Sequence, residues 1–262
     1  MKFLAKWRVR KPADDAETVY VSEKYGVRSL HIGSDTVQSA MRIAKPNELE
    51  LSYTRSMMGF MLFNERPQRV LMIGLGGGSL AKFIYHRLPQ ARTRVIEISP
   101  QVVAIARQYF HVPQDEERFS IIVGDGAEHV AQDGDEPDLI IVDGYDAESH
   151  VEALSSRAFY EACRKRLGAR GILVVNLWGG DREFNETLKR IESAFPGGTA
   201  CLPAEKPGNV AVFAFRDHPG NPRWEDLEQS GRILQQAYGL EFPRFVGSLR
   251  KMNRHDAQQL FI

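Results

Sequence analysis

The sequence contains little of what marks an exported or metal-dependent protein. It has two cysteines, and these lie far apart at Cys163 and Cys201, so neither a disulfide framework nor a zinc cluster is expected. The seven histidines show no spacing that is typical of metal ligands. We therefore predict a reduced, cytoplasmic protein without a metal site.

An excess of charge of one sign is also missing. The 34 Lys and Arg residues balance the 34 Asp and Glu residues, which gives no general attraction to nucleic acid or to an anionic membrane surface. No apolar run approaches the roughly 20 residues that cross a bilayer, and basic residues interrupt any signal-peptide core near the amino end. We expect neither a nucleic-acid nor a membrane partner, and we expect a solvated amino-terminal segment.

Two segments with different periodicity open the chain. Residues 17–41 alternate apolar and polar side chains between turn residues, which predicts a short antiparallel β-meander. Residues 48–63 carry apolar side chains at helical spacing, which predicts a linking helix with the methionines in its core face. We expect an amino-terminal domain over residues 1–64 and a larger domain over residues 65–262.

The larger domain begins with short apolar runs separated by amphipathic stretches. The runs cover residues 70–73, 94–98, 120–123, 139–142 and 172–175. Buried strands that alternate with helices are typical of βαβ units and of a parallel sheet. The sequence therefore predicts an α/β domain with a Rossmann-like sheet, and a further strand at 209–215.

A glycine-rich loop follows the first of these strands. Gly74, Gly76 and Gly78 stand where a ligand must approach the backbone closely. Glu97 ends the second strand, roughly 20 residues further on, where a carboxylate can accept hydrogen bonds from both ribose hydroxyls. Ser79 replaces the third glycine of the dinucleotide fingerprint, so the pattern favours an adenosyl sulfonium over a dinucleotide.

Asp125 and Gly126 follow the third strand. The Asp125 carboxylate can accept a hydrogen bond from an adenine amino group, and it can also cap the helix that follows. Because the carboxyl ends of parallel strands meet at one edge of a sheet, these groups and Glu97 should form one crevice. We predict a site of the S-adenosylmethionine-dependent transferase type, with the loop glycines, Glu97, Asp125 and Gly126 binding the nucleoside.

A second pair of carboxylates follows the fourth strand. Asp143 and Asp146 are three residues apart, and such a pair can hold an ammonium group and, when one member is desolvated, accept its proton. A primary amine is protonated in water and needs such a base before it attacks. Tyr145 can contact the amine or cover the sulfonium by a cation–π contact. The alternative is an Asx-turn followed by a helix cap.

The segment from Val70 to Asp146 resembles the polyamine aminopropyltransferases, the spermidine synthase-like family. The similarity includes the glycine loop and the strands that end at Glu97 and Asp143. Outside this segment, the amino-terminal meander also resembles the family's small β-domain. The resemblance implies transfer from decarboxylated S-adenosylmethionine or S-adenosylmethionine to a small amine such as putrescine, in polyamine biosynthesis, by a homodimer. It implies that Asp143 is the amine's proton acceptor and that the substrate-binding residues are Asp146, Tyr145, Tyr53 and Gln38.

Several residues depart from this family's pattern. Family members usually carry an aspartate in the glycine loop that binds the aminopropyl amine, and this chain has Gly77 there. Thr54 and Arg55 replace polar and acidic residues, and Arg55 would repel a polyamine if it faced the pocket. A methyltransferase and a non-catalytic nucleoside-binding homologue therefore remain alternatives, and a dinucleotide oxidoreductase is a more distant one.

Overall fold

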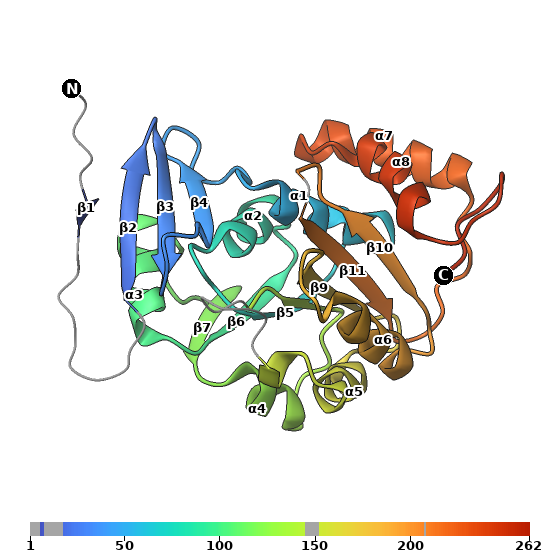
Figure 1. The fold of residues 1–262 in the computed structure, drawn as a ribbon, viewed down its shortest axis with the longest axis horizontal. Coiled ribbons are helices and arrows are strands. Elements are labelled where there is room, and N and C mark those ends of the chain that lie inside the picture. Colours follow the sequence, from blue (N-terminus) through green and yellow to red (C-terminus); the bar gives the residue numbers. More distant parts are fainter. Residues whose placement is uncertain (1–5, 8–17, 145–151, 207) are drawn as a thin grey trace.

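The computed structural model describes residues 6–7, 18–144, 152–206 and 208–262. Within these ranges a seven-stranded sheet has the order β10-β11-β9-β8-β5-β6-β7 (Figure 1). Its strands are β5 (Arg69–Ile73), β6 (Arg92–Glu97), β7 (Phe119–Val123), β8 (Leu139–Val142), β9 (Ile172–Trp178), β10 (Thr199–Pro203) and β11 (Asn209–Phe215). The strands β5 to β9 pair in parallel, whereas β10 and β11 are antiparallel.

The predicted α/β class with a Rossmann-like parallel sheet is confirmed. All five predicted parallel strands form, and β11 has the predicted bounds. The strand β10 was not predicted, because Thr199–Pro203 is too short and too poor in β-branched residues to give a strand pattern.

The predicted meander forms a second, antiparallel sheet. Its strands β2 (Val19–Lys24), β3 (Val27–Ile32) and β4 (Ser39–Arg42) follow each other in space. The amino-terminal segment is not wholly a solvated terminus, because β1 (Lys6–Trp7) pairs with β2. An edge strand presents unpaired N–H and C=O groups, and a short extended segment can form hydrogen bonds with them. The sequence did not predict β1, because a strand of two residues is too short to show a periodic pattern.

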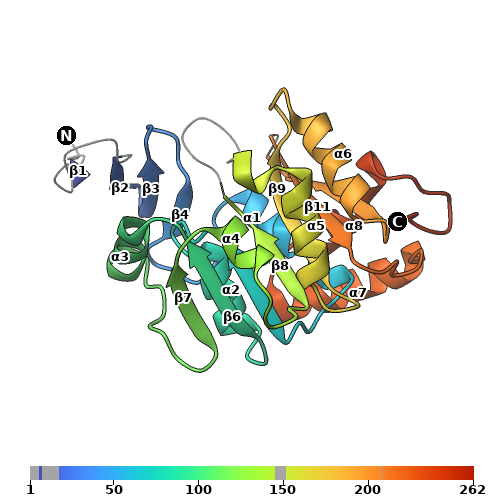
Figure 2. The same ribbon diagram turned by 90° about the horizontal axis from the view of Figure 1, so that it is seen from below.

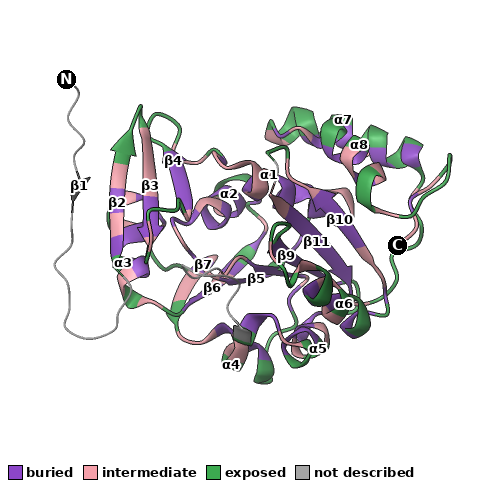
Figure 3. Cartoon of the chain, viewed as in Figure 1, coloured by how far each residue is buried: buried purple, intermediate pink, exposed green. Residues whose placement is uncertain are grey.

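Helices cover both faces of the large sheet (Figure 2). They are α1 (Ser52–Met57), α2 (Ser79–Arg87), α3 (Pro100–Tyr109), α4 (Gly126–Ala131), α5 (Arg157–Arg166), α6 (Phe184–Ala194), α7 (Trp224–Tyr238) and α8 (Phe242–Met252), with 3₁₀ turns η1 (Met58–Leu62) and η2 (Glu152–Leu154). Successive residues of β5 enter opposite cores: Val70 and Met72 pack in one, and Leu71 and Ile73 in the other. Both faces of the central strands are therefore buried (Figure 3).

The predicted linking helix is shorter than its periodicity indicated. The α-helix α1 gives way to a 3₁₀ turn at Met58, next to Gly59. A Cβ atom at Gly59 would lie 2.7 Å from the Leu202 side chain on β10, so the backbone approaches the sheet closely here. Met57, Met58 and Met61 are buried as predicted, and they fasten the linking segment to the large sheet.

Candidate active site

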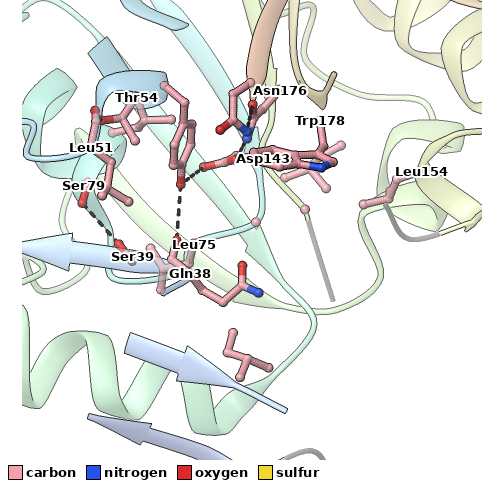
Figure 4. Close-up of a pocket in the computed structure, with 18 of the residues that line it drawn as sticks. Gln38, Ser39, Leu51, Thr54, Leu75, Ser79, Asp143, Leu154, Asn176 and Trp178 are labelled. Atoms are coloured by element: carbon pink, nitrogen blue, oxygen red, sulfur yellow. Dashed lines mark hydrogen bonds between the residues drawn. The ribbon is translucent and has the colours of Figure 1, made fainter. Parts of the chain in front are cut away.

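A pocket of about 800 Å³ lies along the carboxyl ends of the sheet strands (Figure 4). The large sheet supplies one wall, and the end of the small sheet together with α1 supplies the other. The predicted residues that line it are Gln38, Tyr53, Gly74, Gly76, Glu97, Asp125, Gly126 and Asp143. The structure thus brings together most of the predicted site, from both parts of the chain.

Gly74 has the backbone geometry that the loop prediction required. Its φ angle is +92°, and a Cβ atom there would lie 2.3 Å from the backbone oxygen of Asp143. Only glycine avoids this contact. Gly78, with φ +69°, caps α2, but it is not among the residues that line the pocket. The start of the loop therefore lies directly against the backbone of Asp143, which follows the neighbouring strand β8.

Glu97 lies buried at the end of β6 with both oxygens held by backbone groups. Its Oε2 atom accepts a hydrogen bond of 2.8 Å from the Leu75 amide in the glycine loop. Its Oε1 atom accepts one of 3.0 Å from the Ser99 amide. The carboxylate is thus fixed beside the loop, and its remaining lone pairs are available to ligand hydroxyls.

Asp125 is the N-cap of α4, which was one of its two predicted roles. Its Oδ1 atom accepts hydrogen bonds from the amides of Ala127 and Glu128, at 2.7 and 3.2 Å. Asp125 also lines the pocket, so capping and ligand binding are compatible here. Next to it, a Cβ atom at Gly126 would lie 2.3 Å from the Ile73 side chain, and this close packing explains the glycine without any ligand.

Within the described ranges, the side chains that donate hydrogen bonds to Asp143 are uncharged. Asn176 Nδ2 donates to Oδ1 at 3.0 Å, and the Tyr53 hydroxyl lies 3.3 Å from Oδ2 and equally far from the Gln38 carbonyl oxygen. The residue keeps part of its surface open to the pocket. Desolvation by the surrounding protein nevertheless outweighs the two hydrogen bonds and raises the pKa of Asp143 to about 6.

Three residues on β9 and β11 line the pocket, although the sequence either did not predict them or did not assign them to it. Asn176 and Trp178 lie two residues apart on β9 and both line the pocket, as does Asn209 on β11. Trp178 was predicted either to line the pocket or to be buried, and 48% of its surface is exposed. The period of two along a strand gives Asn176 and Trp178 the same face, but a continuous apolar strand pattern does not reveal which face meets a ligand.

Arg55 and Gly77 differ from the family's pattern, but neither residue lines the pocket. Arg55 turns to Glu205 and Glu241, at 3.4 and 3.3 Å, and does not line the pocket. At Gly77 a Cβ atom would lie 2.7 Å from Ser39 Oγ, so this loop has no room for an aspartate without a shift. Arg55 therefore does not repel a substrate, and the Ser39 hydroxyl lies next to Gly77.

Other predictions concern two further site residues, metals and membranes. Tyr145 and Asp146 lie outside the described residues. Within the described ranges, no cluster of three or more His, Cys, Asp or Glu side chains has the arrangement of a metal site. In the same ranges, no helix combines the length and apolarity that a membrane span requires.

Comparison with known proteins decides the family. Residues 50–203 match the spermine/spermidine synthase domain. A polyamine aminopropyltransferase from Chromobacterium violaceum is 42% identical over 255 residues, which cover 97% of this chain and 98% of the relative. The chain belongs to the spermine/spermidine synthase family. The predicted resemblance is confirmed, and with it the prediction of an aminopropyltransferase-type enzyme.

Solved structures of the family share the fold. A probable spermidine synthase from Corynebacterium glutamicum has a TM-score of 0.72 at 17% identity, with 98% of each chain covered. A spermidine synthase in complex with the transition state analogue AdoDATO has a TM-score of 0.65 at 20% identity, with 94% of this chain and 89% of that chain covered. The family's pairing of a small sheet with a Rossmann-like sheet is thus present here.

Proposed function

We propose that the chain transfers an aminopropyl group from decarboxylated S-adenosylmethionine to a short diamine such as putrescine. The observation that carries the proposal is Asp143, a desolvated carboxylate with a pKa of about 6 at the wall of a pocket that also contains Glu97 and Asp125. A base of this kind remains ionised at neutral pH and can still accept a proton from an ammonium group.

The strand order supports one direction for the two proposed substrates. Asp125 follows β7, Glu97 ends β6, the glycine loop follows β5, Asp143 follows β8, and Asn176 lies on β9. Neighbouring strands are about 4.8 Å apart, so this edge spans about 19 Å from β7 to β9. Adenine, ribose, sulfonium and amine therefore follow one another along it, with the reacting carbon between the glycine loop and Asp143.

The reaction needs alignment and one proton acceptor. Asp143 takes a proton from the acceptor's ammonium group, and the freed nitrogen lone pair attacks the carbon bound to the positively charged sulfur. The new C–N bond forms while the C–S bonding pair stays on sulfur, which leaves as a neutral thioether. The protein contributes orientation of the two substrates and removal of the proton.

Two pocket hydroxyl groups support a binding place for the donor's own amino group. Ser39 and Ser79 both line it, and their Oγ atoms are 3.3 Å apart beside the glycine loop. Hydroxyl oxygens accept hydrogen bonds from an ammonium group without a counter-charge. We assign the aminopropyl amine to this pair, in the place of the missing loop carboxylate.

The far end of the pocket favours a short acceptor. Trp178 and Asp181 offer an aromatic face and a carboxylate to the acceptor's second ammonium group. Arg182 and Lys206 line the same end, and neither forms an ion pair with any other described residue. A longer polyamine would bring a further ammonium group toward these cations, which disfavours it.

Donor selection tests the proposal directly. Purified protein is incubated with putrescine and either decarboxylated or ordinary S-adenosylmethionine, and the products are identified by mass spectrometry. We expect an aminopropylated diamine from the decarboxylated donor only. A preference for ordinary S-adenosylmethionine with a methylated product would establish the methyltransferase alternative instead, and no turnover with either donor would favour a non-catalytic homologue.

The family resemblance also predicts a homodimer in the cytoplasm. Light scattering of the purified protein in solution tests the first of these predictions, and fractionation of cells tests the second.

A further inference from the structure

We propose that Asn209 is a positioning residue that sets the amide orientation of Asn176 and, through it, the hydrogen bonding of the Asp143 carboxylate. The proposal rests on the proposed role of Asp143 as the proton acceptor. It assigns a part in the reaction to a side chain that has no hydrogen bond to Asp143 in the structure.

The three side chains form a hydrogen-bonded chain across two strands. Asn209 Nδ2 donates to Asn176 Oδ1 at 3.0 Å, and Asn176 Nδ2 donates to Asp143 Oδ1 at 3.0 Å. Figure 4 shows the Asn176 amide directed at Asp143. All three residues line the pocket.

The sheet register explains why Asn209 can reach Asn176. In the antiparallel pair β9 and β11, Asn209 stands opposite Trp178, and Ala211 stands opposite Asn176. Asn209 and Asn176 are therefore diagonal neighbours, at a spacing of about 7–8 Å that long side chains bridge. Asn176 is buried, so its amide takes its orientation from the protein groups around it.

The orientation matters because the two ends of an amide act oppositely on a carboxylate. With its NH₂ group toward Asp143, Asn176 stabilises the ionised form. Rotated by half a turn, it would present its oxygen and destabilise that form. The Asn209 amide opposes this rotation, because a donor beside Asn176 Oδ1 leaves its NH₂ group for Asp143.

The ionisable groups around Asp143 are compatible with this account. Tyr53 on α1 donates to the other carboxylate oxygen. The remaining ionisable side chains that line the described pocket are Glu97, Asp125, Asp181, Arg182 and Lys206, and desolvation and the two hydrogen bonds govern the raised pKa of Asp143. Among the described residues, orientation of Asn176 is therefore a means by which the protein adjusts this base.

Asn209→Ala tests the proposal through the pH dependence of kcat/KM. We expect the acidic limb to move upward by up to about one pH unit, because without the Asn209 donor the reversed Asn176 amide becomes accessible and the hydrogen bond to the charged form weakens. The rate should fall by up to about tenfold below the limb and remain near that of the parent above it. A general structural defect would lower the rate at every pH.

A double-mutant cycle with Asn176→Ala separates an indirect effect from a direct one. If Asn209 acts through Asn176, Asn209→Ala shifts the limb in the parent and has no further effect in the Asn176→Ala background. Asn209→Asp adds a contrast, because its carboxylate accepts from the Asn176 NH₂ group and stabilises the reversed amide. In the parent background, Asn209→Asp should shift the limb further than Asn209→Ala does. In the Asn176→Ala background, only the effect of the added negative charge should remain, and subtracting it from the shift in the parent gives the part that acts through Asn176.

Asn221→Ala is the matched control, because Asn221 accepts a hydrogen bond from the Ile262 amide and does not line the pocket. Its pH profile should equal that of the parent.

Three outcomes would each overturn the proposal. They are an unchanged limb in Asn209→Ala, equal effects of Asn209→Ala in both backgrounds, and a raised KM with an unchanged kcat, which would show direct substrate contact. Failure of the proposed function has a different readout, because the parent enzyme would then give no aminopropylated product in the donor-selection assay. Asp143→Asn with undiminished kcat would refute the role of Asp143 as the base, so these failures are distinguishable from that of the Asn209 proposal.

Discussion

The two halves of the pocket hold their carboxylates in different ways. Glu97 and Asp125, in the half proposed to bind the nucleoside (the nucleoside half), accept hydrogen bonds from backbone amides. Asp143, in the half proposed to carry out the reaction (the reacting half), accepts them from Tyr53 and Asn176, which are 90 and 33 residues away in sequence. A carboxylate held by the backbone is a fixed binding group, whereas one held by uncharged side chains in a desolvated place has a basicity that the protein can adjust.

The comparison is tested most strongly by Asp143→Asn. Loss of the base should lower kcat by about 10²- to 10⁴-fold, which is the usual contribution of general base catalysis, while the affinity for the donor nucleoside stays close to that of the parent. Steady-state kinetics and calorimetric titration of the donor measure the two quantities. A variant that kept its turnover would show that the two halves do not differ in function.

The same variant should have a pH-dependent effect on stability. Burial raises the Asp143 pKa from 3.8 to about 6, so the ionised form is the unfavourable one in the folded protein. Ionisation of Asp143 therefore lowers the free energy of unfolding of the parent protein. This loss is absent below about pH 4 and complete above about pH 6, where it is about 3 kcal/mol. Asn does not ionise, so the free energy of unfolding of Asp143→Asn minus that of the parent should grow as the pH rises through this window.

Denaturant unfolding of both proteins at pH 4, 5, 6 and 8 measures this difference. A hydrogen-bond mismatch of the Asn amide with Tyr53 or Asn176 would add the same offset at each pH, so the change with pH is the decisive quantity. A difference that is flat across the series would mean that the Asp143 carboxyl is not desolvated.

Glu97→Gln tests the nucleoside half. A neutral amide loses the charged acceptor for the ribose hydroxyls, so donor affinity should fall by about 10- to 100-fold, with a smaller change in the KM of the amine acceptor. Binding of the donor is followed by calorimetry, and thermal unfolding controls for the lost backbone hydrogen bonds. Donor affinity within twofold of the parent would contradict the ribose-binding role.

Trp178→Ala has the smallest expected effect and concerns the far end of the reacting half. Loss of a cation–π surface should raise the KM of the diamine by about 3- to 30-fold and leave donor affinity unchanged. Trp178→Phe keeps an aromatic face and should lie between the alanine variant and the parent. Equal KM values in all three proteins would exclude Trp178 from acceptor binding.

Much of the nucleoside half could be predicted because its groups lie at the ends of strands that are visible as apolar runs. The positions of Gly74, Glu97 and Asp125 follow from the chain order and from the rule that parallel strands share a carboxyl edge. Gly78 is an exception, since its positive φ serves the start of α2 and not the pocket. A glycine pattern alone does not separate these two needs.

The amino-acid sequence by itself determined the fold class, the family and the carboxylates at the strand ends, because periodicity and local motifs record burial and backbone geometry. Only the tertiary structure decided that Arg55 turns away from the pocket toward Glu205 and that Asn209 reaches Asn176. Those outcomes depend on the register of β9 with β11 and on the packing of α1 against the large sheet. Such contacts join residues far apart in sequence, so no local pattern contains them.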